Sequence, residues 1–131
     1  MSDDIWYHGS PLRLDTLALG STVTRDRRYA EVFSHKPRLV VVDDAGRIRH
    51  DGRSAGFLHR VAESVREMDV EPHPRSTMAP GVEWLTRRPL RLAWLATVEV
   101  SPEELLSECE VSELVARLSR DRLQDNSGVN G

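Results

Sequence analysis

Hydrophobic positions along this chain fall into short runs, and most runs alternate with polar residues as half-buried strands do. Residues 5–8 are aromatic-rich and end at Gly9, which predicts a first strand, and the β-branched residues 21–24 predict a second. Residues 38–43 and 90–100 predict two further strands, the last of them long. A fold built around a sheet is therefore expected.

Three other stretches give weaker signals. Residues 56–65 fit one face of a helix and also fit a strand. Residues 12–20 carry leucines without long helical continuity, so we expect a turn or a short helix there. The turn signal at residues 44–46 predicts that residues 47–50 pair back on the preceding strand as a hairpin.

One helix is predicted after the second strand. Thr24 can cap a helix from about residue 25 to residue 33, because Tyr29, Ala30 and Phe33 then share a face. A helix between strands indicates an α+β domain rather than an all-β one.

The C-terminal part carries a second helical signal. Residues 101–104 form a capping box with proline at the first helical position, and Ser112 can open a further helix. We expect residues 101–123 to form a helical cap packed on the sheet, completing a single domain over residues 1–123. The polar residues 124–131 predict a disordered tail.

Composition narrows the class of protein. The 131 residues are 39% hydrophobic and 30% charged, with a net charge of −3, and no basic block of the kind that binds a phosphate backbone is present. Lys36 is the only lysine among 18 basic residues. Genomic base composition would explain the excess of arginine, and phosphate-binding guanidinium groups would be the functional explanation.

Cysteine content and hydrophobicity bear on location. Cys109 is the only cysteine, so no intramolecular disulfide is expected and we interpret it as structural. No secretory signal and no apolar run near the roughly 20 residues that span a bilayer is visible, so no membrane partner is expected. A cytoplasmic protein is the default prediction, although an effector delivered by other means would have the same pattern.

The loop predicted at residues 71–81 contains three prolines, which favours irregular structure. A loop of this length is long for a compact domain, and such loops are usually functional or mobile.

The first candidate for chemistry is His8, at the end of the first predicted strand and followed by Gly9 and Ser10. Glycine lets a second backbone or a flat ligand approach closely, and the segment offers an imidazole, an amide and a hydroxyl. The alternative interpretation is a hydrogen-bonded core histidine.

The second candidate is Glu83, which precedes Trp84 at the start of a predicted strand and follows the proline-rich loop. A carboxylate there could line a cleft, or it could face solvent from an edge strand. The remaining histidines lack metal-ligand spacing, and no dinucleotide, P-loop or hydrolase-elbow motif is present, so no metal site is predicted.

Residues 7–10 (Tyr-His-Gly-Ser), a Thr/Ser-rich strand leading into a helix, and residues 83–86 (Glu-Trp-Leu-Thr) together resemble the ADP-ribosyltransferase superfamily. The chain is most similar to the small bacterial branch that includes the rifampin ADP-ribosyltransferases. The resemblance spans about residues 5–100 and leaves the C-terminal helical part unexplained.

The resemblance implies a split mixed or antiparallel sheet with flanking short helices and NAD bound in a cleft. It implies that His8 binds a ribose hydroxyl of NAD, that the backbone of Gly9 holds the nicotinamide amide, and that Ser10 lies at the same site. Cofactor contacts would also come from Thr22, Thr24 and Tyr29, the last stacking on nicotinamide.

Glu83 would be the acidic catalytic residue, with His8 as its catalytic partner. A carboxylate can stabilise the positive charge that develops on the ribose as nicotinamide leaves. Arginine-modifying members of the superfamily carry an acid or amide two residues before the catalytic glutamate, and this chain has Gly81 there. Asp69 and Glu71 are alternatives for the acidic role.

The function predicted is transfer of ADP-ribose from NAD to an acceptor that the sequence does not name. An RNA 2′-phosphotransferase using Arg87, Arg88 and Arg91, or an NAD glycohydrolase, would use a similar cleft. A non-catalytic module, such as one partner of a toxin–antitoxin pair, would instead dock through the C-terminal helices.

Overall fold

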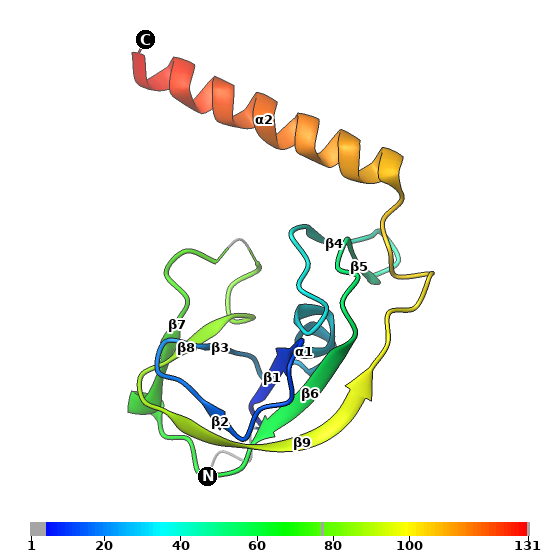
Figure 1. The fold of residues 1–131 in the computed structure, drawn as a ribbon. Helices are drawn as coiled ribbons and strands as arrows, with labels where there is room; N and C mark the ends of the chain where they lie inside the picture. Colours follow the sequence, from blue (N-terminus) through cyan, green and yellow to red (C-terminus); the bar gives the residue numbers. More distant parts are fainter. Residues whose placement is uncertain (1–4, 77, 131) are drawn as a thin grey trace.

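The structure is a computed structural model that describes residues 5–76 and 78–130, with side chains as far as Arg120. It is a mixed α+β fold (Figure 1). In chain order the elements are β1 (Tyr7–Ser10), β2 (Thr16–Leu17), β3 (Thr22–Val23), α1 (Arg27–Phe33), β4 (Val40–Val42), β5 (Ile48–His50), β6 (Gly56–Val61), the 3-10 helix η1 (Glu67–Asp69), β7 (Val70–Pro72), β8 (Trp84–Thr86), β9 (Leu90–Val98) and α2 (Glu108–Asn130).

The strands form one four-stranded sheet, β1-β6-β9-β2, one three-stranded sheet, β3-β8-β7, and the separate hairpin β4-β5. Every pair of named strands is antiparallel. A bridge between Tyr7 and Thr24 joins the first two sheets, and the register of β6 against β9 shifts between Leu58 and His59. Such irregularities increase strand bending, which agrees with the curved β9 in Figure 1. The α+β prediction is confirmed at this level.

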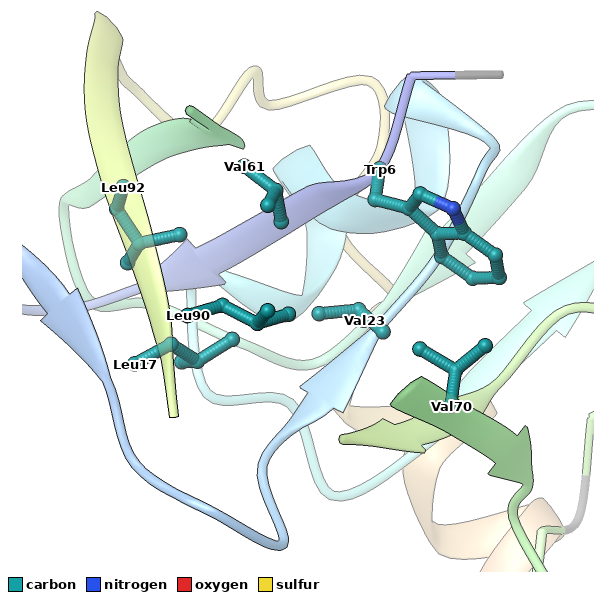
Figure 2. Close-up of a cluster of buried hydrophobic side chains, with 7 residues drawn as sticks. All are labelled: Trp6, Leu17, Val23, Val61, Val70, Leu90 and Leu92. Carbon is teal, nitrogen blue, oxygen red and sulfur yellow. The ribbon is translucent and has the colours of Figure 1, made fainter. Parts of the chain in front are cut away.

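The hydrophobic core lies where the two larger sheets face each other (Figure 2). Its buried members come from the residue before β1, from β2 and β3, and from the strands β6, β7 and β9: Trp6, Leu17, Val23, Val61, Val70, Leu90 and Leu92. Burying a side chain of this size contributes about 1.5–3 kcal/mol. The core therefore fixes the two sheets against each other and leaves the β4-β5 hairpin and α2 outside it.

Helix α1 packs on β1 because Gly9 has no side chain. A Cβ at Gly9 would lie 1.8 Å from the carbonyl oxygen of Ala30. The N-cap of the helix is Asp26, whose Oδ1 accepts a hydrogen bond from the amide of Arg28 at 2.9 Å. The sequence placed this cap at Thr24. Thr24 Oγ1 instead accepts from the amide of Asp26 at 3.1 Å, two residues before the cap.

Three local predictions resolve as strands. Residues 56–65, which fitted helix or strand, contain β6. In residues 12–20 the expected turn is present at Leu19–Gly20, but Thr16–Leu17 before it pairs with β9 as β2, which the sequence did not predict. The loop expected from residue 71 begins later, because Val70–Pro72 pairs with β8. Proline is tolerated there because β7 is the edge strand of its sheet.

The C-terminal part differs most from expectation. Residues 101–104 do not begin a helix, although the amide of Ser101 donates to Glu104 Oε1 at 2.6 Å as in a capping box. A single helix, α2, begins at Glu108, and its length of 23 residues is not that of a short flanking helix. The predicted tail at 124–131 lies outside the described side chains.

Helix α2 passes above the sheets instead of lying on them (Figure 1). The first turn of α2 is held by Arg49 of β5, which forms a bidentate ion pair with Glu110. The Arg49 guanidinium also donates to the carbonyl of Leu105 at 2.9 Å. Val115 and Leu118 remain 49% and 54% exposed. In the described residues, no helix is both long and apolar enough to span a membrane.

Candidate functional site

A cavity of about 850 Å³ lies between the sheets and helix α2. Its walls come from β1, β3, the α1–β4 connection, the loop before β8, and α2. Its lining residues include His8, Gly9, Ser10, Thr22, Thr24, Phe33, Lys36, Arg38, Glu83 and Arg117. In Figure 1 the loop between β7 and β8 and the segment leading into β4 rise on opposite sides, with α2 above both.

His8 enters the cavity from β1 with one ring nitrogen already engaged. Its Nδ1 lies 2.7 Å from the carbonyl oxygen of Thr22, and because a carbonyl only accepts, Nδ1 must carry the proton. Burial lowers the pKa of His8, against a raising effect of the Thr22 carbonyl, and the charge of nearby His59 lowers it further. The neutral ring therefore has Nε2 as a hydrogen-bond acceptor.

His59 holds the strand that carries His8. The amide of Leu14 donates to His59 Nε2 at 2.9 Å, so Nδ1 carries the proton and donates to the carbonyl of His8 at 3.3 Å. His59 is completely buried, and its role is that of the hydrogen-bonded core histidine that was the alternative interpretation for His8.

The small residues around His8 are held by backbone contacts. Ser10 is 7% exposed, and its Oγ accepts from the amide of Leu12 at 3.0 Å. Thr22 and Thr24 lie on the neighbouring strand segment, where Thr24 is 1% exposed and pairs with Tyr7 through two backbone hydrogen bonds. The absence of a side chain at Gly9 is explained by its contact with α1, while its backbone still lines the cavity.

Glu83 lines the same cavity from the opposite side, one residue before β8. Its Oε1 accepts a hydrogen bond from Ser76 Oγ at 2.9 Å, and its carbonyl accepts from the amide of His73 at 3.0 Å. The proline-rich loop thus positions the carboxylate while leaving its second oxygen without a partner among the described residues.

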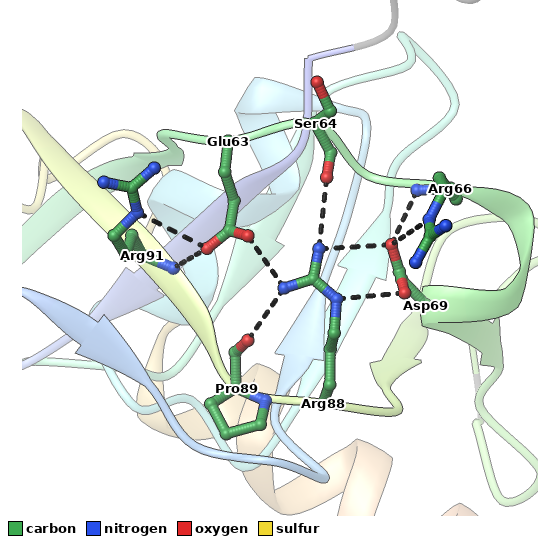
Figure 3. Close-up of polar contacts among 7 residues, drawn as sticks. All are labelled: Glu63, Ser64, Arg66, Asp69, Arg88, Pro89 and Arg91. Carbon is green, nitrogen blue, oxygen red and sulfur yellow. Dashed lines mark hydrogen bonds and ion pairs between the residues drawn. The ribbon is translucent and has the colours of Figure 1, made fainter.

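The two other candidate acids lie elsewhere. Glu71 is exposed on the edge strand β7. Asp69 is 4% exposed and accepts from Arg88 through both oxygens, at 3.0 and 3.2 Å, and from the amide of Arg66 at 2.8 Å (Figure 3). The hydrogen bonds from Arg88 lower the pKa of Asp69. Neither acid is among the described residues that line the cavity.

The arginines expected of a phosphotransferase are also outside the cavity. Arg88 is paired with Asp69 and with Glu63, and Arg91 lies 3.8 Å from Glu63. Arg87 is exposed. In the described structure these three side chains do not form a phosphate site in this cleft.

Tyr29 is not brought to the cavity wall, although it shares helix α1 with a residue that is. Phe33 lines the cavity, and the Tyr29 ring packs against it with ring centroids 6.0 Å apart. The helical spacing that placed both residues on one face was visible in the sequence. The spacing did not show which of the two rings would line the cavity.

Sequence reasoning missed the cationic part of the cavity. Lys36 and Arg38 come from the α1–β4 connection, and Arg117 comes from α2. The available signal was the single lysine in an arginine-rich chain. The arginines could not be sorted without the fold, because the charge pattern is mixed throughout.

No cluster of three or more His, Cys, Asp or Glu side chains able to hold a metal ion occurs among the described residues. His35 and His50 are buried and stack with ring centroids 5.5 Å apart, but two imidazoles alone do not make a metal site. Cys109 is exposed on α2, so it has no role in the core.

Comparison of this chain with protein-family models, with curated proteins and with solved structures found no match. The candidate site therefore rests on its own geometry and chemistry.

Proposed function

We propose that this protein binds NAD in the cavity and transfers ADP-ribose to an acceptor. The observation that carries the proposal is that Glu83 lines the same cavity as His8, Gly9 and Ser10, although it lies more than 70 positions away from them in the chain. These are residues on which the resemblance to ADP-ribosyltransferases rests. A volume of about 850 Å³ falls within the range of roughly 300–1,000 Å³ typical of ligand pockets.

His8 serves as a binding group. Its Nδ1–H is engaged by the carbonyl of Thr22, so Nε2 accepts a hydrogen bond from a ribose hydroxyl. Because burial lowers the pKa of His8, the ring stays neutral at physiological pH and keeps this acceptor. A second backbone interaction, to the nicotinamide amide, comes from Gly9.

Glu83 supplies the electrostatic part of the reaction. The bond between C1′ of the ribose and the nicotinamide nitrogen breaks, and its electron pair leaves with nicotinamide, which departs neutral. The ribose gains positive charge, which the Glu83 carboxylate stabilises. A nucleophilic atom of the acceptor then forms a bond to C1′ and loses its proton to solvent or to a base of the acceptor site.

The test is release of nicotinamide from NAD, followed together with transfer of labelled ADP-ribose to proteins, nucleic acids or small molecules supplied separately. We expect release that depends on Glu83, with label transferred to one acceptor class. Release without transfer to any of them would favour the glycohydrolase alternative. No Glu83-dependent release and no transfer would refute the proposal.

One observation favours a second candidate function, binding of a partner protein. Val115 and Leu118 on α2 are about half exposed, and an apolar helix face of this kind is typical of docking segments. A partner bound there would lie at the rim of the cavity, because Leu118 also lines it.

A further inference from the structure

The charges that line the cavity are distributed unevenly. Three cationic side chains, Lys36, Arg38 and Arg117, and one carboxylate, Glu83, are present among the described lining residues. The whole chain has a net charge of −3, so this local excess of positive charge runs against the overall balance. A cavity lined by cations attracts anionic ligands.

None of these three cations has a carboxylate partner among the described residues, a property they share with exposed arginines outside the cavity such as Arg87. Other described arginines are paired with Asp or Glu, as in Arg28 with Asp26 and Arg47 with Asp43. No described carboxylate forms an ion pair with Lys36, Arg38 or Arg117. Their charge is therefore available to a ligand.

The backbone holds Lys36 and Arg38 in place. Asp51 Oδ1 accepts from the amides of Arg38 and Leu39, at 2.7 and 2.8 Å, so the carboxylate is used by the main chain and not by the guanidinium. Lys36 has φ 54°, the only positive φ of a non-glycine residue in the described chain. Glycine would adopt this conformation without strain, so the position carries a lysine side chain at a conformational cost.

The cations and the carboxylate come from opposite walls. Lys36 and Arg38 lie on the segment leading into β4, Glu83 lies on the loop before β8, and α2 crosses above both (Figure 1). A ligand that spans the cavity meets a carboxylate at one end and cations at the other. Lysine and arginine together match the several oxygens of a diphosphate group.

We infer that Lys36, Arg38 and Arg117 form a diphosphate-binding site between α2 and the α1–β4 connection. Through Arg117, this site gives α2, the element that the family resemblance leaves unexplained, a direct contact with ligand. That the diphosphate belongs to the dinucleotide donor rests on the proposed function, whereas the site itself does not. Lys36 and Arg38 also line a second cavity of about 530 Å³, into which the rest of the ligand can extend.

The test measures binding of inorganic pyrophosphate and of ADP to the full chain by titration calorimetry. Arg117→Gln should weaken both by roughly tenfold, the size expected for a charge-assisted hydrogen bond. The matched control is Arg120→Gln, which removes the same charge from an exposed position of the same helix that does not line the cavity. Equal affinities in the two variants would overturn the assignment of Arg117.

Lys36→Gly provides the second variant. It removes the amine while relaxing the left-handed backbone, so thermal stability should not fall whereas pyrophosphate affinity should fall roughly tenfold. Unchanged affinity in this variant, or no binding of pyrophosphate and ADP to the unmodified protein, would overturn the inference.

The outcome is distinguishable from that of the proposed function. Glu83→Gln should not weaken pyrophosphate binding, because it removes a negative charge from the cavity and leaves the three cations in place. Pyrophosphate binding without any release of nicotinamide from NAD would support the site and count against the transferase. Release of nicotinamide with equal activity and affinity in the Arg117 and Arg120 variants would support the transferase and overturn the site.

Discussion

Two charged regions of this protein are built in opposite ways. Around Arg88, every charge has a partner: its guanidinium contacts Asp69, Glu63 and the carbonyl oxygens of Ser64 and Pro89 (Figure 3). In the cavity, by contrast, Lys36 has no described carboxylate partner, and the Glu83 carboxylate has a single described hydrogen bond. Charged side chains whose hydrogen-bonding groups are all paired within the protein stabilise the fold. Charged side chains without protein partners remain available to bind a ligand or take part in a reaction.

The consequence is that the two regions should respond differently to mutation. Changes in the Arg88 region should alter stability and leave ligand chemistry intact. Changes in the cavity should alter ligand chemistry and leave stability nearly intact.

The largest effect is expected for Glu83→Gln. Nicotinamide release from NAD should fall about 100-fold or more, because one preorganised group that stabilises developing charge is removed. The melting temperature should stay close to that of the unmodified protein, since glutamine can still accept the hydrogen bond from Ser76. Steady-state kinetics measures the loss of nicotinamide release, and thermal unfolding measures the melting temperature.

The control for that variant is Glu71→Gln, which neutralises an exposed carboxylate outside the cavity. It should leave turnover unchanged. Loss of activity in the Glu71 variant with normal activity in the Glu83 variant would transfer the acidic role to Glu71.

The next effect is expected for Asp69→Asn. The free energy of unfolding should fall by about 2 kcal/mol, because asparagine cannot accept the paired hydrogen bonds of Arg88 through both side-chain atoms. Turnover per folded molecule should be unchanged. Chemical denaturation and activity measured on the same preparation would separate the effect on stability from the effect on turnover. A loss of turnover without a loss of stability would contradict the structural role of Asp69.

A smaller effect should distinguish two aromatic residues of α1. Phe33→Leu should weaken NAD binding by roughly fivefold, as expected for loss of an aromatic contact. Tyr29→Leu should weaken it less, because Tyr29 reaches the cavity only through Phe33. The reverse order in a binding titration would restore Tyr29 as the stacking residue.

The smallest effect concerns the attachment of α2. The ion pair with Arg49 lowers the pKa of Glu110 to about 2, below its ordinary value. A carboxyl group whose pKa is lowered by folding contributes stability above its ordinary pKa and loses it as the pH falls through the folded value. The acid-induced loss of stability from about pH 5 downward should therefore be shallower in Glu110→Gln. Thermal unfolding of both proteins across this pH range measures the difference. Identical dependence of the melting temperature on pH in the two proteins would show that the Arg49–Glu110 ion pair contributes nothing to stability.

Local pattern predicted much of the sheet. The aromatic run before Gly9, the hairpin around the turn at residues 44–46 and the long alternating strand ending at Val98 were all visible from side-chain periodicity. The candidate residues His8 and Glu83 were also identifiable, because each ends or begins a strand beside a glycine or a loop. That they line one cavity could only be a hypothesis until the antiparallel sheets were known.

The features that could not be predicted from the sequence depend on tertiary contacts. Pro72 argued against a strand, but an edge strand needs no amide there. Residues 101–104 formed the capping hydrogen bond without a helix, because Leu105 and Leu106 are held by backbone contacts around His50. The catalytic candidate Asp69 was indistinguishable from Glu83 until Arg88 was seen to occupy both of its oxygens.

The most direct test of the proposed binding of NAD in the cavity is thermal unfolding of the purified protein with and without NAD, repeated with His8→Ala. A ligand that binds only the folded state raises stability in proportion to the logarithm of its concentration above the dissociation constant. The account predicts an upward shift of the melting temperature that grows with NAD concentration and is lost in the His8 variant. No shift of the unmodified protein at millimolar NAD, or an equal shift in the two proteins, would contradict it.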